Sequence, residues 1–235
     1  MASINTNYGA MVAAQALAAT GRELDRVQNR VTTGLKIASA KDNGAVWAIA
    51  TTQKANAMTL DATLNTLRRD QSINDVGLAA GDTIMAALTE MKSLAAAIEA
   101  GGTGVAAYQA DYDALATEIA DAVTDATFDG TAALTTPAGG TPAAVATAAG
   151  VQTAIDAWAG ALQAVGTTSK SLERQITFNT KLQDALEAGV GNLVDADLAK
   201  ESAKLTALQT KQQLGVQALS IANQSSGILL SLFRG

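Results

Sequence analysis

The stretch LTALQTKQQLGVQALSIANQSSGILLSLF, residues 205–233, decides the fold of this chain. Apolar and small residues recur through it in alternating steps of three and four, the spacing of a coiled-coil helix face. The members of this first seam are Leu205, Leu208, Gln212, Gly215, Leu219, Ala222, Ser226, Leu229 and Phe233. The spacing predicts a long helix that packs lengthwise against another helix.

A second seam runs along the same stretch beside the first one. Its members are Leu214, Ala218, Ile221, Ser225, Ile228 and Leu232. A helix that is apolar on two sides needs neighbours on more than one face, and one helix of the same chain covers only one of these faces. We therefore expect other copies of the chain to cover the rest.

The N-terminal segment is the candidate neighbour within the chain. Residues 1–21 carry no charged side chain, and neither do residues 212–233, so both ends are uncharged, semi-apolar strips. The N-terminal strip and its continuation supply Ile4, Tyr8, Met11, Leu17, Leu24, Val27 and Val31. We expect this segment to pair with the C-terminal helix in an antiparallel arrangement.

The residues between the two ends predict further helices of the same kind. A heptad-like series predicts a helix over about 44–100, and the sequence GGTG at 101–104 interrupts it. A shorter helix follows over about 105–122.

The segment 128–150 contains both prolines, several glycines and a run of threonines, and these turn signals predict a hairpin and loops. Helical periodicity resumes at Val151, and Gly189 and Gly191 are expected to separate this helix from the last one. The predicted fold class is mainly α: long antiparallel helices in a coiled-coil rod, with a small β-hairpin and loop region near 127–150.

The composition argues against most enzyme mechanisms. The 235 residues include 52 Ala and eight aromatic side chains, with no Cys and no His. The chain therefore has no thiolate nucleophile, no imidazole base, no disulfide and no zinc site of the usual type. Asp121, Asp125 and Asp129 recur every four residues, but a solvated acidic face explains them better than a cation site. We predict no catalytic residue, no cofactor and no metal site.

Charge and hydropathy also argue against nucleic acid and membranes as partners. The net charge is −6 and the sequence pI is near 4.6, opposite to what a phosphate backbone attracts. Residues 93–169 contain eight acidic side chains and no Lys or Arg. No basic residue precedes the N-terminal apolar strip, as a secretory signal would require, and the Gln, Asn and Ser residues of the C-terminal strip make bilayer insertion costly.

Five stretches, in order, resemble bacterial flagellin over nearly the whole chain. They are SINTNYGAMVAAQAL at 3–17, RVTTGLKIASAKDNGAVWAIA at 30–50, RDQSINDVGLAAGDTIMAALTEMKSLA at 69–95, FDG at 128–130 and the segment from 194 to 235 that begins VDADLAK. The large outer variable domains of longer flagellins are absent from the sequence, because only about twenty residues separate the helices near Phe128 and Val151.

The resemblance implies a domain division and a set of partners. Residues 1–36 and 192–235 would form an inner terminal-helix domain, and residues 37–191 an outer helical domain. The implied partners are other copies of this chain or of other flagellins, the flagellar export apparatus, a secretion chaperone, the filament cap and the hook-junction proteins. The implied location is the secreted, extracellular flagellar filament. Lys92 and Ser93 depart from the family segment that the animal innate receptor contacts, which implies weak receptor activation.

The predicted function is that of a structural subunit that self-assembles into the flagellar filament used for swimming. The alternatives are a hook-filament junction protein of the same superfamily and a soluble coiled-coil signalling or chaperone module. We assign filament-core packing to Ile4, Tyr8, Met11, Leu17, Leu24, Val27, Leu205, Leu208, Leu214, Leu219, Ile221, Leu229 and Phe233. The candidates for O-glycosylation are Thr131, Thr135, Thr136 and Thr141.

Overall fold

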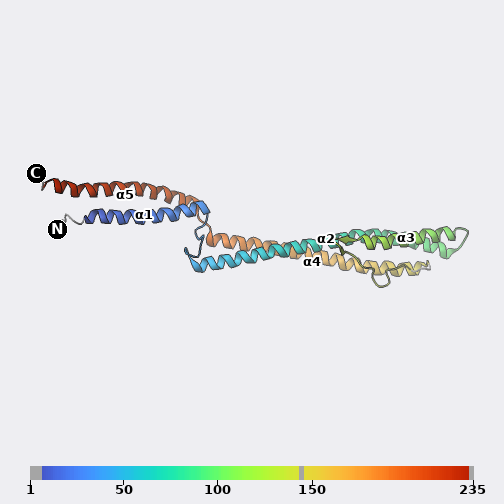
Figure 1. Cartoon of the computed structure of the whole chain (residues 1–235). Coiled ribbons are helices and arrows are strands. Elements are labelled where there is room, and N and C mark those ends of the chain that lie inside the picture. The colour runs from blue at the N-terminus through green and yellow to red at the C-terminus, as the bar shows by residue number, and fades with distance from the viewer. Residues whose placement is uncertain (1–6, 143–145, 233–235) are drawn as a thin grey trace. The chain divides into compact units, whose positions relative to one another are not determined.

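The computed structural model describes residues 7–142 and 146–232, with side chains in the last helix up to Gln224. It contains five helices and one hairpin in the order α1, α2, α3, β1, β2, α4, α5 (Figure 1). The chain divides into two compact units. One comprises Met1–Ala57 and Ala185–Gly235, and the other comprises Met58–Asp184.

The first unit is built around α1 (Tyr8–Thr33) and α5 (Leu198–Leu232). Asn7 caps the start of α1, because its side-chain oxygen accepts a hydrogen bond from the Ala10 amide at 3.0 Å. At the other end, Gly34 adopts the left-handed conformation with φ 71°, and its amide donates to the Arg30 carbonyl at 2.9 Å.

The second unit holds the main hydrophobic core of the chain. It combines most of α2 (Gly44–Ala100), all of α3 (Val105–Asp125) and the first part of α4 (Ala148–Val194). The largest fully buried side chains of this core are Trp158, Tyr112, Ile84, Leu88, Met91 and Val151. Thus a few large residues fill the space between helices that are otherwise rich in alanine.

Within the second unit α2 and α4 run antiparallel. The Gln183 amide donates to the Asp61 carboxylate at 2.8 Å, and further along, Gly81 of α2 lies against the Leu162 side chain of α4. A Cβ atom at position 81 would overlap the Leu162 methyl groups. Glycine is therefore what allows the two helices to approach closely here.

The predicted hairpin is present and short. β1 (Thr127–Phe128) pairs with β2 (Thr131–Ala132) in antiparallel register, and Asp129 and Gly130 have positive φ angles of 52° and 72°. Two consecutive positive φ angles are typical of the tight turns that suit the twist of a hairpin. Arg69 of α2 forms an ion pair of 3.0 Å with Asp129, which joins the turn to the helix.

The prediction of a helix over 44–100 is confirmed by α2, but the predicted break at Gly189 and Gly191 is wrong. α4 continues through both glycines to Val194, because an interior glycine costs a helix only about 1 kcal/mol. The chain turns at 195–197 instead, where the Asp197 carboxylate accepts from the Lys200 amide at 3.1 Å and so caps α5. The boundaries between the compact units lie inside α2 and α4, at 57/58 and 184/185.

Candidate assembly surface

α1 and α5 form one antiparallel pair with a defined register. Three polar contacts join them along its length. The Asn7 amide donates to the Ala222 carbonyl at 2.7 Å, Lys204 pairs with Glu23 at 3.0 Å, and Arg30 pairs with Glu201 at 3.1 Å. Sequence periodicity predicted the antiparallel pairing of the two ends, but it did not reveal these contacts, because polar partners so far apart in the chain leave no local signal.

The first seam of α5 lies on the side that is covered within the single chain. Leu208 is buried, and Leu205, Gly215, Leu219 and Ala222 are half-buried. At Gly215 the helices approach so closely that a Cβ atom would lie 3.2 Å from Leu17 Cδ1. On α1, the buried residues are Thr20 and Val27. The pair therefore has a narrow buried interface.

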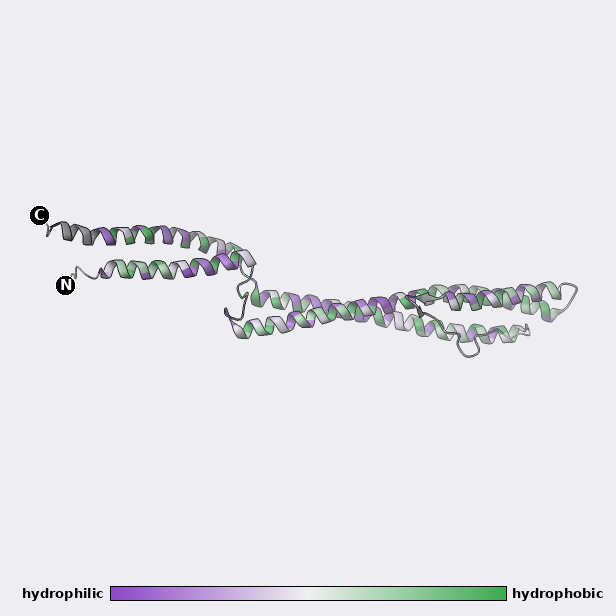
Figure 2. Cartoon of the chain, in the orientation of Figure 1, coloured by the Kyte–Doolittle hydropathy of each residue, from purple (hydrophilic) through white to green (hydrophobic). Residues whose placement is uncertain are grey.

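The second seam is exposed as far as its side chains are described. Leu214 is 59% exposed and Ile221 is 67% exposed, and Ala218 between them is also exposed. The first turns of α1 have the same character, since Tyr8 is 74% and Met11 is 64% exposed. Hydrophobic residues recur along both helices, as Figure 2 shows. Contiguous exposed apolar side chains of this kind mark protein interaction surfaces.

The structure separates the residues predicted for filament-core packing into three groups. Leu17, Leu24, Val27, Leu205, Leu208 and Leu219 are buried or half-buried within the chain. Tyr8, Met11, Leu214 and Ile221 are exposed. Ile4 and Phe233 lie outside the described residues, and Leu229 lies in α5 where side chains are not described.

The threonines predicted as glycosylation sites lie on the surface. Thr131, Thr135, Thr136 and Thr141 are all exposed, in and after the hairpin. Over residues 7–142 and 146–232, no group of three acidic side chains is placed to hold a metal ion. Within the same residues, no helix is long and apolar enough to cross a bilayer.

These features define a class of protein: a helical subunit whose two chain ends form one pair with an uncovered apolar side, as in subunits that polymerise through their terminal helices. The bacterial flagellin N-terminal helical region matches residues 4–138, and the bacterial flagellin C-terminal helical region matches residues 148–233. The chain belongs to the bacterial flagellin family and is a structural subunit of the flagellar filament.

Similar proteins match over their full length. Flagellin FljK of Caulobacter vibrioides is 48% identical over 273 aligned positions, which cover 99% of this chain and 98% of the relative. Flagellin FljM of the same organism is 47% identical with the same coverage. A flagellin of Brucella melitensis biotype 1 is 36% identical, with both chains covered completely.

Proposed function

We propose that the second seam of α5 and the exposed first turns of α1 are the surfaces through which copies of this chain pack in the filament. In this proposal, residues 1–36 and 192–235 form the inner layer and residues 37–191 form the outer layer. The exposure of Ile221, Leu214 and Tyr8 on the only helix pair that joins the two chain ends supports this assignment most directly, among the residues that the structure describes.

The free energy gained by burying apolar side chains favours assembly over an isolated α1–α5 pair. Full burial of a Leu or Ile side chain contributes about 1.5–3 kcal/mol, and every copy repeats the contribution. Within one copy, α1 buries only Thr20 and Val27 among its described residues. Ordering long helices costs conformational entropy that such a small interface offsets poorly. Contacts with other copies would supply the missing burial.

Hydrogen exchange tests this proposal. In the unassembled subunit, the amides of α1 and α5 should exchange faster than those of α2 and α3 around Met91 and Tyr112, which lie in the main core. In filaments, the α1 and α5 amides should become as well protected as the core. Equal protection of α5 in the two states would contradict the assignment of the inner layer.

The proposal includes an extracellular location. The chain would be secreted through the flagellar export apparatus with the help of a secretion chaperone, and would meet the hook-junction proteins and the filament cap during growth. Membership of the flagellin family supports each of these partners. Mass spectrometry of secreted protein tests the route, because this export leaves the N-terminal strip intact, whereas a start near Ala14 or Ala19 would indicate a cleaved general secretory signal.

The same mass measurement bears on glycosylation. The exposed side chains of Thr131, Thr135, Thr136 and Thr141 are the proposed acceptors of O-linked sugars. A secreted chain that carries sugar should be heavier than the sequence mass by whole sugar residues. Fragmentation should then place the added mass between residues 127 and 142. An unmodified mass from native filaments would contradict this part of the proposal.

A further inference from the structure

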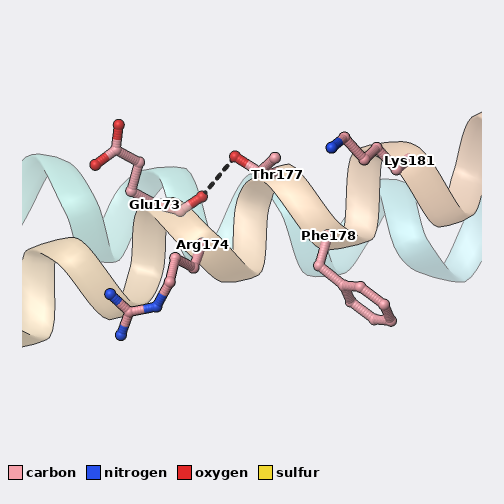
Figure 3. Close-up of a pocket in the computed structure, with 5 residues that line it drawn as sticks. All are labelled: Glu173, Arg174, Thr177, Phe178 and Lys181. Atoms are coloured by element: carbon pink, nitrogen blue, oxygen red, sulfur yellow. Dashed lines mark hydrogen bonds between the residues drawn. The ribbon is translucent and has the colours of Figure 1, made fainter.

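A shallow groove with an exposed aromatic ring lies on α4 in the second unit. Its lining is Glu173, Arg174, Thr177, Phe178 and Lys181. Figure 3 shows two rows of side chains on this face of the helix, with Glu173, Thr177 and Lys181 along one edge and Arg174 and Phe178 along the other. Within each row, successive residues are four apart in sequence, so the space between the two rows is the type of groove into which another helix packs its side chains.

The groove is unpartnered within the described part of the chain. The Phe178 ring is 64% exposed. Neither Arg174 nor Lys181 forms an ion pair or a side-chain hydrogen bond with any described residue. The core that α3 shares with α4 ends near Val165, about 13 Å before Arg174 at the helical rise per residue. The α3 helix of the same copy therefore packs elsewhere along α4.

A matching surface exists on α3. Glu118, Ala122 and Asp125 follow one another in steps of four and three, and so do Arg174, Phe178 and Lys181. Glu118 and Asp125 are exposed and form no ion pair with any residue that the structure describes. Ala122 between them is half-buried, because one side of it packs against the core of its own copy, and only the remaining part is open to another helix. The surrounding sequence is acidic, because residues 93–169 contain no Lys or Arg.

The two helices also run in the same direction within one copy. α3 is antiparallel to α2, to which the short loop at 101–104 joins it, and α4 is antiparallel to α2 as well (Figure 1). In a polymer whose copies share one polarity, α4 of one copy and α3 of the next would therefore be parallel. A parallel pairing fits the spacing of the two sets of residues, because in both sets a step of four residues is followed by a step of three.

We propose that the groove on α4 binds the α3 helix of a neighbouring copy, with Arg174 opposite Glu118, Phe178 over Ala122 and Lys181 opposite Asp125. This inference rests on the proposed self-assembly and names a contact of the outer layer. Alanine is small and leaves room for the ring, while the two charge pairs fix the register. Glu173 at the edge of the groove is the one acidic group of its lining, and it disfavours a shift that would bring Glu118 to its side.

Charge reversal on each side tests the contact. Two double variants of the full-length chain each reverse the charges on one side of the contact: Arg174→Glu with Lys181→Glu on α4, and Glu118→Lys with Asp125→Lys on α3. Each double variant should raise the critical concentration for seeded polymerisation on the order of tenfold. A variant that combines all four changes should return it close to that of the parent chain. High salt should shrink the differences, because screening weakens both the attraction and the repulsion.

Matched controls place the same charges elsewhere in the unit. Arg68→Glu on α2 and Asp113→Lys on the other side of α3 alter exposed residues outside the proposed contact and should leave the critical concentration within about twofold of the parent value. If the fourfold variant fails to recover, or the controls behave like the groove variants, the pairing is wrong. If the parent chain itself does not polymerise, the failure lies with self-assembly instead.

Cross-linking gives a second readout that does not depend on charge. The chain contains no cysteine, so the double variant Phe178→Cys with Ala122→Cys has these two thiols and no others. Under oxidation, filaments of this variant should yield a ladder of disulfide-linked multimers, because the two positions lie within disulfide reach across the contact. Filaments with Phe178→Cys and Asp113→Cys should yield none. Monomers from the first variant's filaments would contradict the proposal.

Discussion

Asn7 and Ala222 are 215 positions apart in the chain, and a hydrogen bond of 2.7 Å joins the Asn7 side-chain amide to the Ala222 carbonyl. The oxygen of the same Asn7 side chain caps α1 through the Ala10 amide. One residue thus starts α1 and fixes its register against α5. Because Ile221 is next to Ala222, this register also determines that Ile221 points away from the pair and is exposed.

The two tryptophans provide a matched test of the core. Trp158 is fully buried, and its indole N–H donates to the Gly140 carbonyl at 2.9 Å, whereas Trp47 is 39% exposed. Trp158→Phe leaves a buried carbonyl without its donor and a gap beside the smaller ring, which should cost about 2–3 kcal/mol. Trp47→Phe should cost less than about 0.5 kcal/mol. Urea denaturation followed by circular dichroism measures both, and equal losses would contradict the assigned core.

Two helical glycines should respond to alanine in opposite ways. Gly160→Ala meets nothing within 4 Å and should stabilise α4 by up to about 1 kcal/mol, because alanine favours the helix. Gly81→Ala places a methyl group against Leu162, and overpacking of about 1–3 kcal/mol should outweigh the same gain. The midpoint temperature of thermal unfolding should therefore rise for Gly160→Ala and fall for Gly81→Ala. A rise for both would show that α2 and α4 are not tightly packed at Gly81.

The pairing of α1 with α5 should weaken in acid through Glu23. The hydrogen bond from Lys204, together with its charge, holds the pKa of Glu23 below the ordinary value of 4.5. The folded form then binds the proton more weakly than the unfolded form. The contribution of the Glu23–Lys204 ion pair to stability is therefore present above the ordinary pKa of Glu23 and is lost as the pH falls through the lowered pKa of the folded form. Carbon NMR of the Glu23 carboxyl should show a higher titration midpoint in Lys204→Met than in the parent, and identical midpoints would contradict the ion pair.

Much of the fold could be predicted because periodicity is a local signal. The helix over 44–100, the hairpin near Phe128 and the pairing of the two ends all follow from heptad steps and turn residues. The break at Gly189 and Gly191 could not be placed correctly, because a glycine inside a helix is tolerated when the surrounding residues favour the helix. The capping carboxylate of Asp197 was the more reliable signal.

The candidate surfaces were only partly predictable. The sequence revealed two seams on α5 but not which one α1 covers, since that choice depends on contacts such as Gly215 with Leu17. The groove around Phe178 carries no sequence motif, and its exposure depends on where the core shared by α3 and α4 ends along α4. Exposure depends on which neighbours are present, and periodicity alone does not report it.

The structure also determines which substitution best tests the second seam. Leu219 belongs to the first seam and is half-buried, so an acidic residue there would disturb the single copy as well as the polymer. Ile221 is two-thirds exposed in the single copy, so Ile221→Asp should leave the isolated subunit as stable as the parent. Thr136 is exposed after the hairpin and provides the matched control, Thr136→Asp.

Pelleting of seeded filaments from these two variants tests the account most directly. In the polymer, Asp at position 221 would be buried without a partner, which costs several kcal/mol in every copy. Ile221→Asp should therefore stay in the supernatant while its circular dichroism matches the parent, and Thr136→Asp should pellet like the parent chain. Filaments from Ile221→Asp at the parent's critical concentration, or their loss in Thr136→Asp, would contradict the assignment of the second seam to the filament interior.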